Sequence, residues 1–153
     1  MTQETILIAA DHAGVELKRT LEAELKKLGF AVRDLGTDST ASTDYPDYAH
    51  PLAKEVSEGR AKRGVLLCGT GLGMSYVANR YPHVRAAVTW SPEVAELAKS
   101  HNDANVLVLP ARFLSDEDAK KILRVWLETR FEGGRHERRV VKIEPNAEAK
   151  RAE

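Results

Sequence analysis

The chain contains a single cysteine, Cys68, among its 153 residues, so no disulfide can form within it. This excludes the small secreted domains that depend on disulfides for their stability. Charge of one sign is not in excess either, because 23 Lys and Arg residues balance 23 Asp and Glu residues. Nucleic-acid-binding domains and proteins that bind anionic membranes usually carry a basic excess, so we expect neither kind of partner.

Long apolar stretches are also missing. None approaches the roughly 20 residues that a membrane-spanning helix needs. The first four residues contain no Lys or Arg, and the apolar run behind them stops at Asp11, which argues against a signal peptide. The composition, with 42% hydrophobic and 30% charged residues, is typical of a folded globular protein. We expect a cytoplasmic protein with one domain over residues 1–153, comprising a core at about 5–140 and a polar tail at 141–153.

Short apolar runs alternate with amphipathic segments along the chain. The runs predict strands at 6–10, 31–35, 64–68, 84–90 and 105–109. Helical spacing and N-cap residues predict helices at about 17–28, 48–59 and 74–80, and further helices that begin near 92 and 116. This alternation favours right-handed crossovers and a parallel sheet with helices on both faces. The predicted fold is a single doubly wound α/β domain, Rossmann-like, with five strands in flavodoxin-like order.

In an open parallel sheet, ligands bind beyond the carboxyl ends of the strands. Asp11 and His12 follow the first predicted strand, Cys68 ends the third, and Arg112 follows the fifth. A carboxylate beside an imidazole can orient the ring. These residues are therefore the first candidates for a functional site.

The loop at 69–73 has the sequence Gly-Thr-Gly-Leu-Gly and joins a predicted strand to a predicted helix. Its glycines let backbone amides approach a ligand closely, and the helix N-terminus behind them favours an anion. The glycine spacing fits neither the dinucleotide fingerprint nor the P-loop. The alternative is a tight turn that binds nothing.

Cys68 lies directly before this loop. Positive partial charge at such a position favours a thiolate, which can act as a nucleophile or accept a proton. The alternative is a small buried hydrophobic residue, the usual role of a lone cysteine.

Two further segments carry polar side chains that suit a ligand. His101 and Asn102 end the fourth predicted helix, where they could equally form a helix C-cap. Arg135 and Arg139 are four residues apart and would share one helix face, where two guanidinium groups suit a phosphate dianion. The alternative for this pair is the start of a solvated basic tail.

Six blocks of sequence, taken in order, resemble one known family. They lie at residues 10–14, 43–46, 68–75, 78–79, 101–106 and 132–136. Together they are similar to the type B ribose-5-phosphate isomerases and to the related galactose-6-phosphate isomerase subunits. One branch of that family uses a glutamate in place of the cysteine. This chain has Cys68 and no acid at 74–75, so it resembles the cysteine branch.

The resemblance implies an enzyme that interconverts ribose-5-phosphate and ribulose-5-phosphate through an enediolate, without metal or organic cofactor. It also implies a homodimer or tetramer whose active sites combine residues of two subunits. The implied catalytic residues are Cys68 as the base, His101 as the acid that opens the sugar ring with help from Asp11, and Thr70 as a ligand of the enediolate oxygen. The implied substrate-binding residues are the amides of Gly69, Gly71, Leu72 and Gly73 at that oxygen, Asn102 at the hydroxyls, Tyr45 at the ring, and His12, Arg112, Arg135 and Arg139 at the phosphate.

Three alternatives remain open from the sequence. A 6-phosphorylated hexose, allose-6-phosphate or galactose-6-phosphate, could replace the pentose in the same mechanism. A non-catalytic sugar-phosphate sensor would keep Arg135 and Arg139 but would not need Cys68. A nucleotide-binding module is the weakest alternative, because no acid that could bind a ribose follows the second predicted strand.

Overall fold

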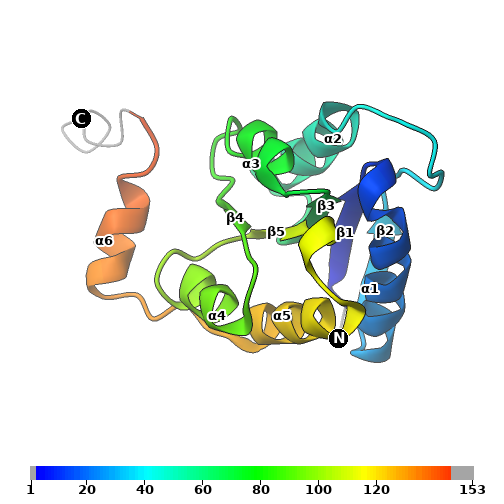
Figure 1. The fold of residues 1–153 in the computed structure, drawn as a ribbon. Coiled ribbons are helices and arrows are strands. Elements are labelled where there is room, and N and C mark those ends of the chain that lie inside the picture. Colours follow the sequence, from blue (N-terminus) through cyan, green and yellow to red (C-terminus); the bar gives the residue numbers. More distant parts are fainter. Residues whose placement is uncertain (1–2, 146–153) are drawn as a thin grey trace.

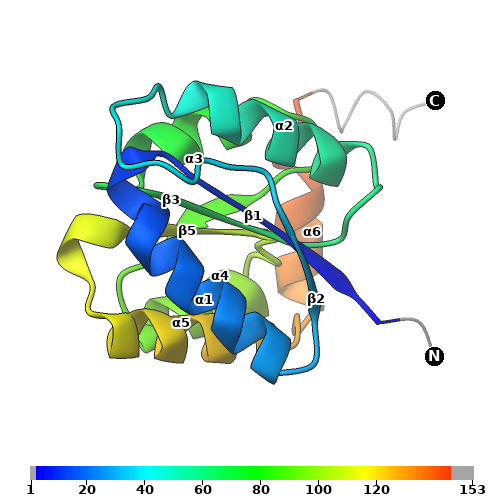
Figure 2. The same ribbon diagram turned by 90° about the vertical axis from the view of Figure 1, so that its right-hand side faces the viewer.

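The computed structural model describes residues 3–145, which form a five-stranded parallel sheet between two layers of helices (Figures 1 and 2). Most strand residues are apolar and buried, as continuous apolar runs predict for a parallel sheet covered on both faces. The strands are β1 (Thr5–Ala10), β2 (Ala31–Asp34), β3 (Gly64–Cys68), β4 (Ala86–Val88) and β5 (Val106–Pro110).

The strand order is β2-β1-β3-β5-β4, with every pair parallel. The first three strands follow the flavodoxin-like order, and the last two are exchanged relative to it. After β1 the chain crosses to β2 at one edge of the sheet, and after β3 it crosses to β4 at the opposite edge. The topological switch point, where open α/β sheets bind their ligands, therefore lies between the carboxyl ends of β1 and β3.

The helices form one layer on each face of the sheet (Figure 2). One layer contains α1 (Val15–Lys27), α4 (Pro92–Ser100) and α5 (Asp116–Glu128), and the other contains α2 (Pro46–Ser57) and α3 (Leu72–Ala78). Two single-turn helices, η1 (His12–Gly14) and η2 (Ala111–Phe113), follow β1 and β5. No helix in residues 3–145 is both long and apolar enough to cross a bilayer.

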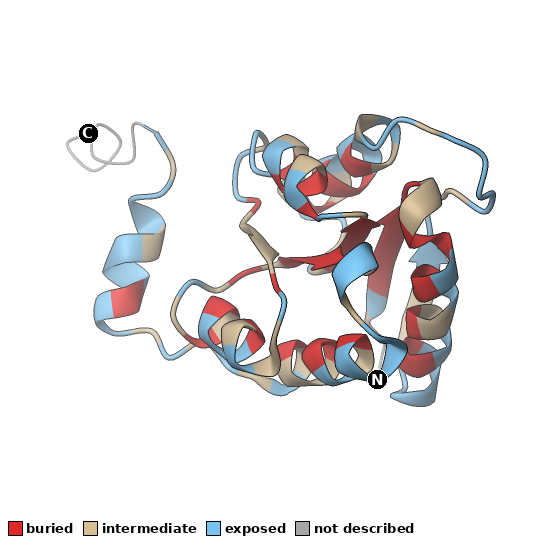
Figure 3. Cartoon of the chain, viewed as in Figure 1, coloured by how far each residue is buried: buried red, intermediate tan, exposed pale blue. Residues whose placement is uncertain are grey.

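Alternate strand residues belong to two separate cores, one under each helical layer. Buried residues accordingly colour the central strands and parts of the helices that cover them (Figure 3). In β1, Ile6 and Ile8 pack beneath α1, while Leu7 and Ala9 pack beneath α2. Trp126 of α5 is fully buried, and its indole N–H donates to the backbone carbonyl of Ala104 at 3.0 Å. The sheet is thus fixed from both sides, which gives the loops at its carboxyl edge a rigid base.

A sixth α-helix, α6 (Arg135–Val141), lies apart from the sheet and its covering helices (Figure 1). The predicted helix face shared by Arg135 and Arg139 therefore exists, and the helix continues into the predicted tail. The remainder of that tail, 146–153, lies outside the described residues. The expected strand at 84–90 is reduced to Ala86–Val88 at the sheet edge, where the Asn79 side chain bonds to both backbone groups of Ala86.

Candidate active site

Asp11 lies at the switch point, directly after β1. Its side chain is buried and accepts a hydrogen bond from the backbone N–H of Ala13 at 3.0 Å, which caps η1. Gly14 at the end of η1 fits so closely against β3 that a methyl group there would lie 2.8 Å from the Cβ of Leu67. The close packing of η1 on β3 holds Asp11 and His12 beside the end of the cysteine strand.

His12 is held by Thr43 in the segment between β2 and α2. The backbone N–H of Thr43 donates to His12 Nδ1 at 3.1 Å, and the backbone N–H of His12 donates to Thr43 Oγ1 at 3.3 Å. Because Nδ1 accepts a hydrogen bond, the neutral ring carries its proton on Nε2. His12 can therefore present an N–H donor to an anionic ligand.

Cys68 is buried at the carboxyl end of β3, and the loop that follows brings one of its amides to the sulfur. The backbone N–H of Gly71 donates to Cys68 Sγ at 3.2 Å. This turn needs a glycine, because Gly71 has a φ of 78°, in the left-handed region. Thr70 Oγ1 accepts the N–H of Leu72 at 3.2 Å, which leaves the threonine hydroxyl proton free to donate to a ligand.

Two side chains close over this loop from different elements. Arg112 in η2 lies against Gly69, where a methyl group would be 2.9 Å from the guanidinium Nε. The ring of Tyr45 lies against Gly73, where a methyl group would be 2.6 Å away. The structure therefore brings Asp11, His12, Tyr45, the 68–73 segment and Arg112 to one edge of the sheet, as expected. We call this group the cysteine cluster.

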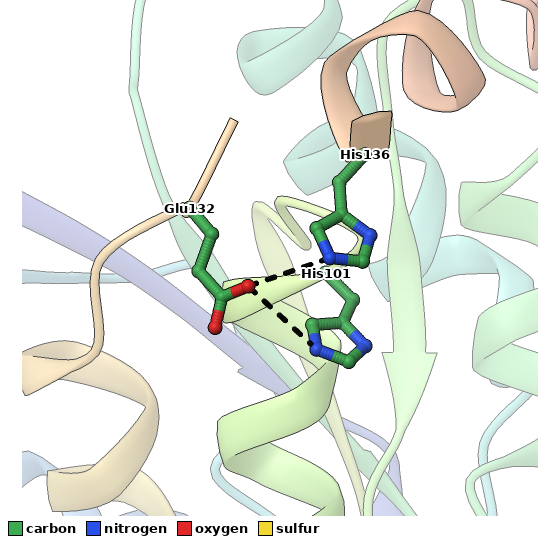
Figure 4. A group of neighbouring side chains, drawn as sticks. All are labelled: His101, Glu132 and His136. Atoms are coloured by element: carbon green, nitrogen blue, oxygen red, sulfur yellow. Dashed lines mark ion pairs between the residues drawn. The ribbon is translucent and has the colours of Figure 1, made fainter. Parts of the chain in front are cut away.

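A second group of predicted residues lies where α4 ends and α6 begins. The His101 ring stacks on the His136 ring, with centroids 4.1 Å apart and ring planes 13° apart. Glu132 lies beside both rings, 3.9 Å from His101 Nε2 and 3.4 Å from His136 Nε2 (Figure 4). Burial lowers the pKa of His136 below its usual value, and the nearby positive groups of His101 and Arg135 lower it further.

The arginines of α6 and Asn102 complete this second group. Arg135, Arg139 and Asn102 are exposed. The backbone N–H of Glu132 donates to the carbonyl of Ser100 at 3.0 Å, which ties the start of the α6 segment to the end of α4. We call His101, Asn102, Arg135 and Arg139, with Glu132 and His136, the histidine cluster.

The two clusters lie at opposite ends of the strands, the cysteine cluster at the carboxyl ends and the histidine cluster at the amino ends. Asn105, which follows the histidine cluster in the chain, accepts a hydrogen bond from Gly64 at the amino end of β3, whereas Cys68 ends the same strand. A five-residue strand separates its two ends by about 13 Å. One copy of the chain therefore does not bring His101 to Cys68, although the sequence predicts both in one active site.

Three residues that bear on the site were given no role from the sequence. Thr43 and His136 lie within the sequence blocks at 43–46 and 132–136. The sequence does not show which residues they contact, because each contacts a residue at least 31 positions away. Glu132 likewise faces His101, across the gap between α4 and α6.

Comparison with known proteins identifies the family. The sequence model described as Ribose/Galactose Isomerase matches residues 6–143. The chain belongs to this family. Ribose-5-phosphate isomerase B of Escherichia coli is 44% identical over 138 residues, which cover 90% of this chain and 93% of that protein. Like its relatives in this ribose/galactose isomerase family, the chain is an isomerase.

Solved structures of the family share the fold. A ribose 5-phosphate isomerase from Thermotoga maritima superposes with a TM-score of 0.89 at 50% identity, covering 93% of this chain and 98% of that one. Ribose-5-phosphate isomerase B from Mycoplasma genitalium, solved with bound ribulose-5-phosphate, has a TM-score of 0.90 at 39% identity, and both chains are covered completely. The chain therefore shares its fold with these isomerases, and the exchanged order of its last two strands is compatible with that fold.

Proposed function

We propose that this isomerase interconverts ribose-5-phosphate and ribulose-5-phosphate through an enediolate, with Cys68 as the base. One observation carries the proposal: a buried thiol at the switch point receives the backbone N–H of Gly71 from the glycine loop that follows it. The related structure with bound ribulose-5-phosphate supports this choice of substrate.

The chemistry requires one proton to move between two neighbouring carbons. In the open-chain aldose, the Cys68 thiolate removes the proton from C2, and the electron pair forms the C1–C2 double bond of the enediolate. The negative charge that develops on the C1 oxygen is stabilised by the loop amides and the free hydroxyl proton of Thr70. The proton of the C2 hydroxyl passes to the C1 oxygen, which moves the negative charge to the C2 oxygen. Return of the proton from the thiol to C1 then forms the C2 carbonyl of the ketose and regenerates the thiolate.

Phosphate binding would position the reacting carbons. His12 offers its Nε2–H, and Arg112 lies over Gly69 with its guanidinium beside the loop. A dianion held by these donors and by Arg135 and Arg139 of a second copy would fix C1 and C2 against the thiol, so that binding energy is used for orientation.

We also propose that two copies of the chain form each active site. The cysteine cluster of one copy would meet the histidine cluster of the other, which supplies His101 for ring opening and Asn102 for the sugar hydroxyls. Four large apolar side chains at the carboxyl edge support an interface there, since each is between 48% and 73% exposed. They are Leu72, Tyr76, Trp90 and Phe113.

A direct isomerisation assay in EDTA tests the reaction. We expect rapid conversion of ribose-5-phosphate, slower conversion of allose-6-phosphate and galactose-6-phosphate, and loss of turnover in Cys68→Ala with sugar-phosphate binding retained. Preference for a hexose phosphate would keep the mechanism and replace the substrate. Binding without turnover on all three sugars would contradict the proposed reaction and favour the sensor.

Mixing two inactive variants tests the shared site. Cys68→Ala and His101→Ala chains are refolded together, so that about half of the dimers contain one of each. A mixed dimer then has one site with both substitutions and one site with neither. We expect recovery of about a quarter of the wild-type activity. If both residues came from one chain, every site would carry a substitution and no activity would return.

A further inference from the structure

His101, Glu132 and His136 form a compact set of metal-ligand atoms. One nitrogen from each ring and one carboxylate oxygen all lie within 4.8 Å of one another. The three residues come from different segments, namely the end of α4, the connection before α6, and α6 itself (Figure 4). Proximity therefore results from the fold and not from sequence spacing alone.

The His136 side chain provides a second observation. It is only 8% exposed, and its Nε2 atom has no hydrogen-bond partner among residues 3–145. A buried ring nitrogen without a hydrogen bond is unfavourable, because burial has removed the water that would otherwise satisfy it. The atom faces the Glu132 carboxylate at 3.4 Å, so a cation between the two would satisfy both.

We propose that His101, Glu132 and His136 bind a divalent transition-metal ion of the zinc type, and that the bound ion inhibits the isomerase. Two imidazole nitrogens and one carboxylate oxygen are a ligand set that Zn²⁺ takes with a fourth position left to water. Imidazole also selects against Mg²⁺ and Ca²⁺, which prefer oxygen ligands.

The distances fit such an ion after a small adjustment. Bonds of about 2.0–2.1 Å in a tetrahedral site place neighbouring ligand atoms roughly 3.3 Å apart. The separation between His136 and Glu132 is already 3.4 Å, and that between His101 and Glu132 is 3.9 Å. The stacked rings point their nitrogens in nearly parallel directions, so one ring must tilt. His101 and Glu132 can move, since their side chains are 38% and 58% exposed.

Charges around the site set its strength. Arg135 and Arg139 lie close enough to His136 to lower its pKa, and both disfavour a cation. Glu132 is the carboxylate that offsets them at the site. We therefore expect affinity to depend strongly on Glu132, and we expect a phosphate ligand on the arginines to alter metal binding.

Inhibition rests on the proposed function of His101. A metal ion coordinated by Nε2 of His101 occupies the lone pair that would carry and exchange a proton during ring opening. The ion is therefore not a cofactor, and the isomerase is expected to be fully active in EDTA.

Calorimetric titration of the full, EDTA-treated and dialysed chain with ZnCl₂ measures binding without reference to activity. We expect one ion per chain, and no binding of Mg²⁺. Both His136→Ala and Glu132→Gln should weaken affinity at least about tenfold. The matched control is Glu137→Gln, which removes the same charge from an exposed position in α6 and should change affinity much less. Circular dichroism confirms that each variant is folded.

Two further readouts exclude a different site. With Co²⁺ in place of Zn²⁺, a tetrahedral site gives visible absorption that His136→Ala should abolish. Cys68→Ser should retain His136-dependent metal binding, because the three proposed ligands all belong to one chain and the thiol, which in the proposed dimer comes from the second copy, is not among them. Binding that disappears with Cys68 and survives His136→Ala would overturn the proposal, as would the absence of stoichiometric binding.

The inhibition is then measured with ribose-5-phosphate. The Zn²⁺ concentration for half-inhibition should rise in Glu132→Gln by the same factor as the dissociation constant. Tight binding without inhibition of an active enzyme would refute the inhibitory role. An enzyme without activity in EDTA would refute the proposed function instead, and the titration would still decide the metal site.

Discussion

Replacing Glu22 by glutamine should stabilise the protein above neutral pH and leave it unchanged in acid. Glu22 lies on α1, within hydrogen-bonding reach of Asp34 at the end of β2. Burial raises the pKa of Glu22 to about 7, as do the hydrogen bond and the negative charge of Asp34, while Lys18 and Lys26 oppose the shift. Burial also acts to raise the pKa of Asp34, but hydrogen bonds from Glu22 and Lys18 outweigh it and lower that pKa. The two carboxyl groups therefore share one proton.

The sign of the pH effect follows from the two states of Glu22. Its pKa is about 7 in the folded chain and 4.5 without the fold, so between these values the folded state holds a proton that the unfolded state has released. The stabilisation is complete below pH 4.5 and is lost as the pH rises through 7. A shift of this size corresponds to roughly 3 kcal/mol at full strength. Because Glu22 is partly exposed, solvent and salt reduce it to about 1 kcal/mol.

Urea unfolding between pH 4.5 and 8 measures this effect. Glutamine keeps an N–H donor for Asp34 and cannot ionise, so the free energy of unfolding of Glu22→Gln should exceed that of wild type by about 1 kcal/mol at pH 8 and equal it at pH 4.5. Glu16→Gln, on an exposed part of the same helix, is the control and should show no such change. A difference that is constant with pH would refute the shared proton.

Lys18 links Asp34 to the segment that leads to the active site. This fully buried side chain donates to both Asp34 oxygens, at 2.7 and 2.6 Å, and to Asp38 at 3.1 Å. The segment fixed in this way leads to Thr43, which orients His12, and to Tyr45. Ionisation of Glu22 adds negative charge beside Asp34 and so should loosen the start of that segment.

Three further substitutions test packing and binding. Gly14→Ala should destabilise the protein by about 1–3 kcal/mol in urea unfolding, because its methyl group would lie 2.8 Å from the Leu67 Cβ and 3.1 Å from the Leu67 carbonyl oxygen. An unchanged midpoint would show that η1 moves away from β3 freely. Trp126→Phe removes the donor to the buried carbonyl of Ala104 and should cost about 1–3 kcal/mol in thermal unfolding, more than an indole-to-phenyl volume change alone. Arg139→Ala should raise KM for ribose-5-phosphate about tenfold or more with a smaller change in kcat, and an unchanged KM would remove Arg139 from the phosphate site.

The strands and helices were predictable where the sequence pattern of a segment fits only one kind of element. The apolar run 64–68 is too short and too continuous for an amphipathic helix, and it forms β3 as expected. The exchange of β4 and β5 was not predictable, because both strands lie on the same side of β3 and their order depends on how far from β3 each crossover places its strand. Nothing in the sequence of the short β4 distinguishes an edge position from a central one beforehand.

The cysteine cluster was predictable for a topological reason. Residues directly after parallel strands meet at the same edge, so Asp11, Cys68 and Arg112 had to converge once the strands were assigned. The partners of these residues were not predictable. Thr43 belongs to a long polar segment, and its bond to His12 follows only from the path that the segment takes between β2 and α2.

The position of His101 limits which catalytic steps a single chain can perform. Helix α4 crosses back from the carboxyl edge of the sheet, so its last turn must lie at the amino edge, beside the start of β5. No change of side-chain rotamer moves His101 across the length of a strand, and moving α4 would remove Ala95 from the core and separate α4 from α5. Under the proposed mechanism, ring opening and proton transfer therefore cannot both occur within one isolated chain. Dilution below the dimer dissociation constant should abolish turnover while each chain remains folded.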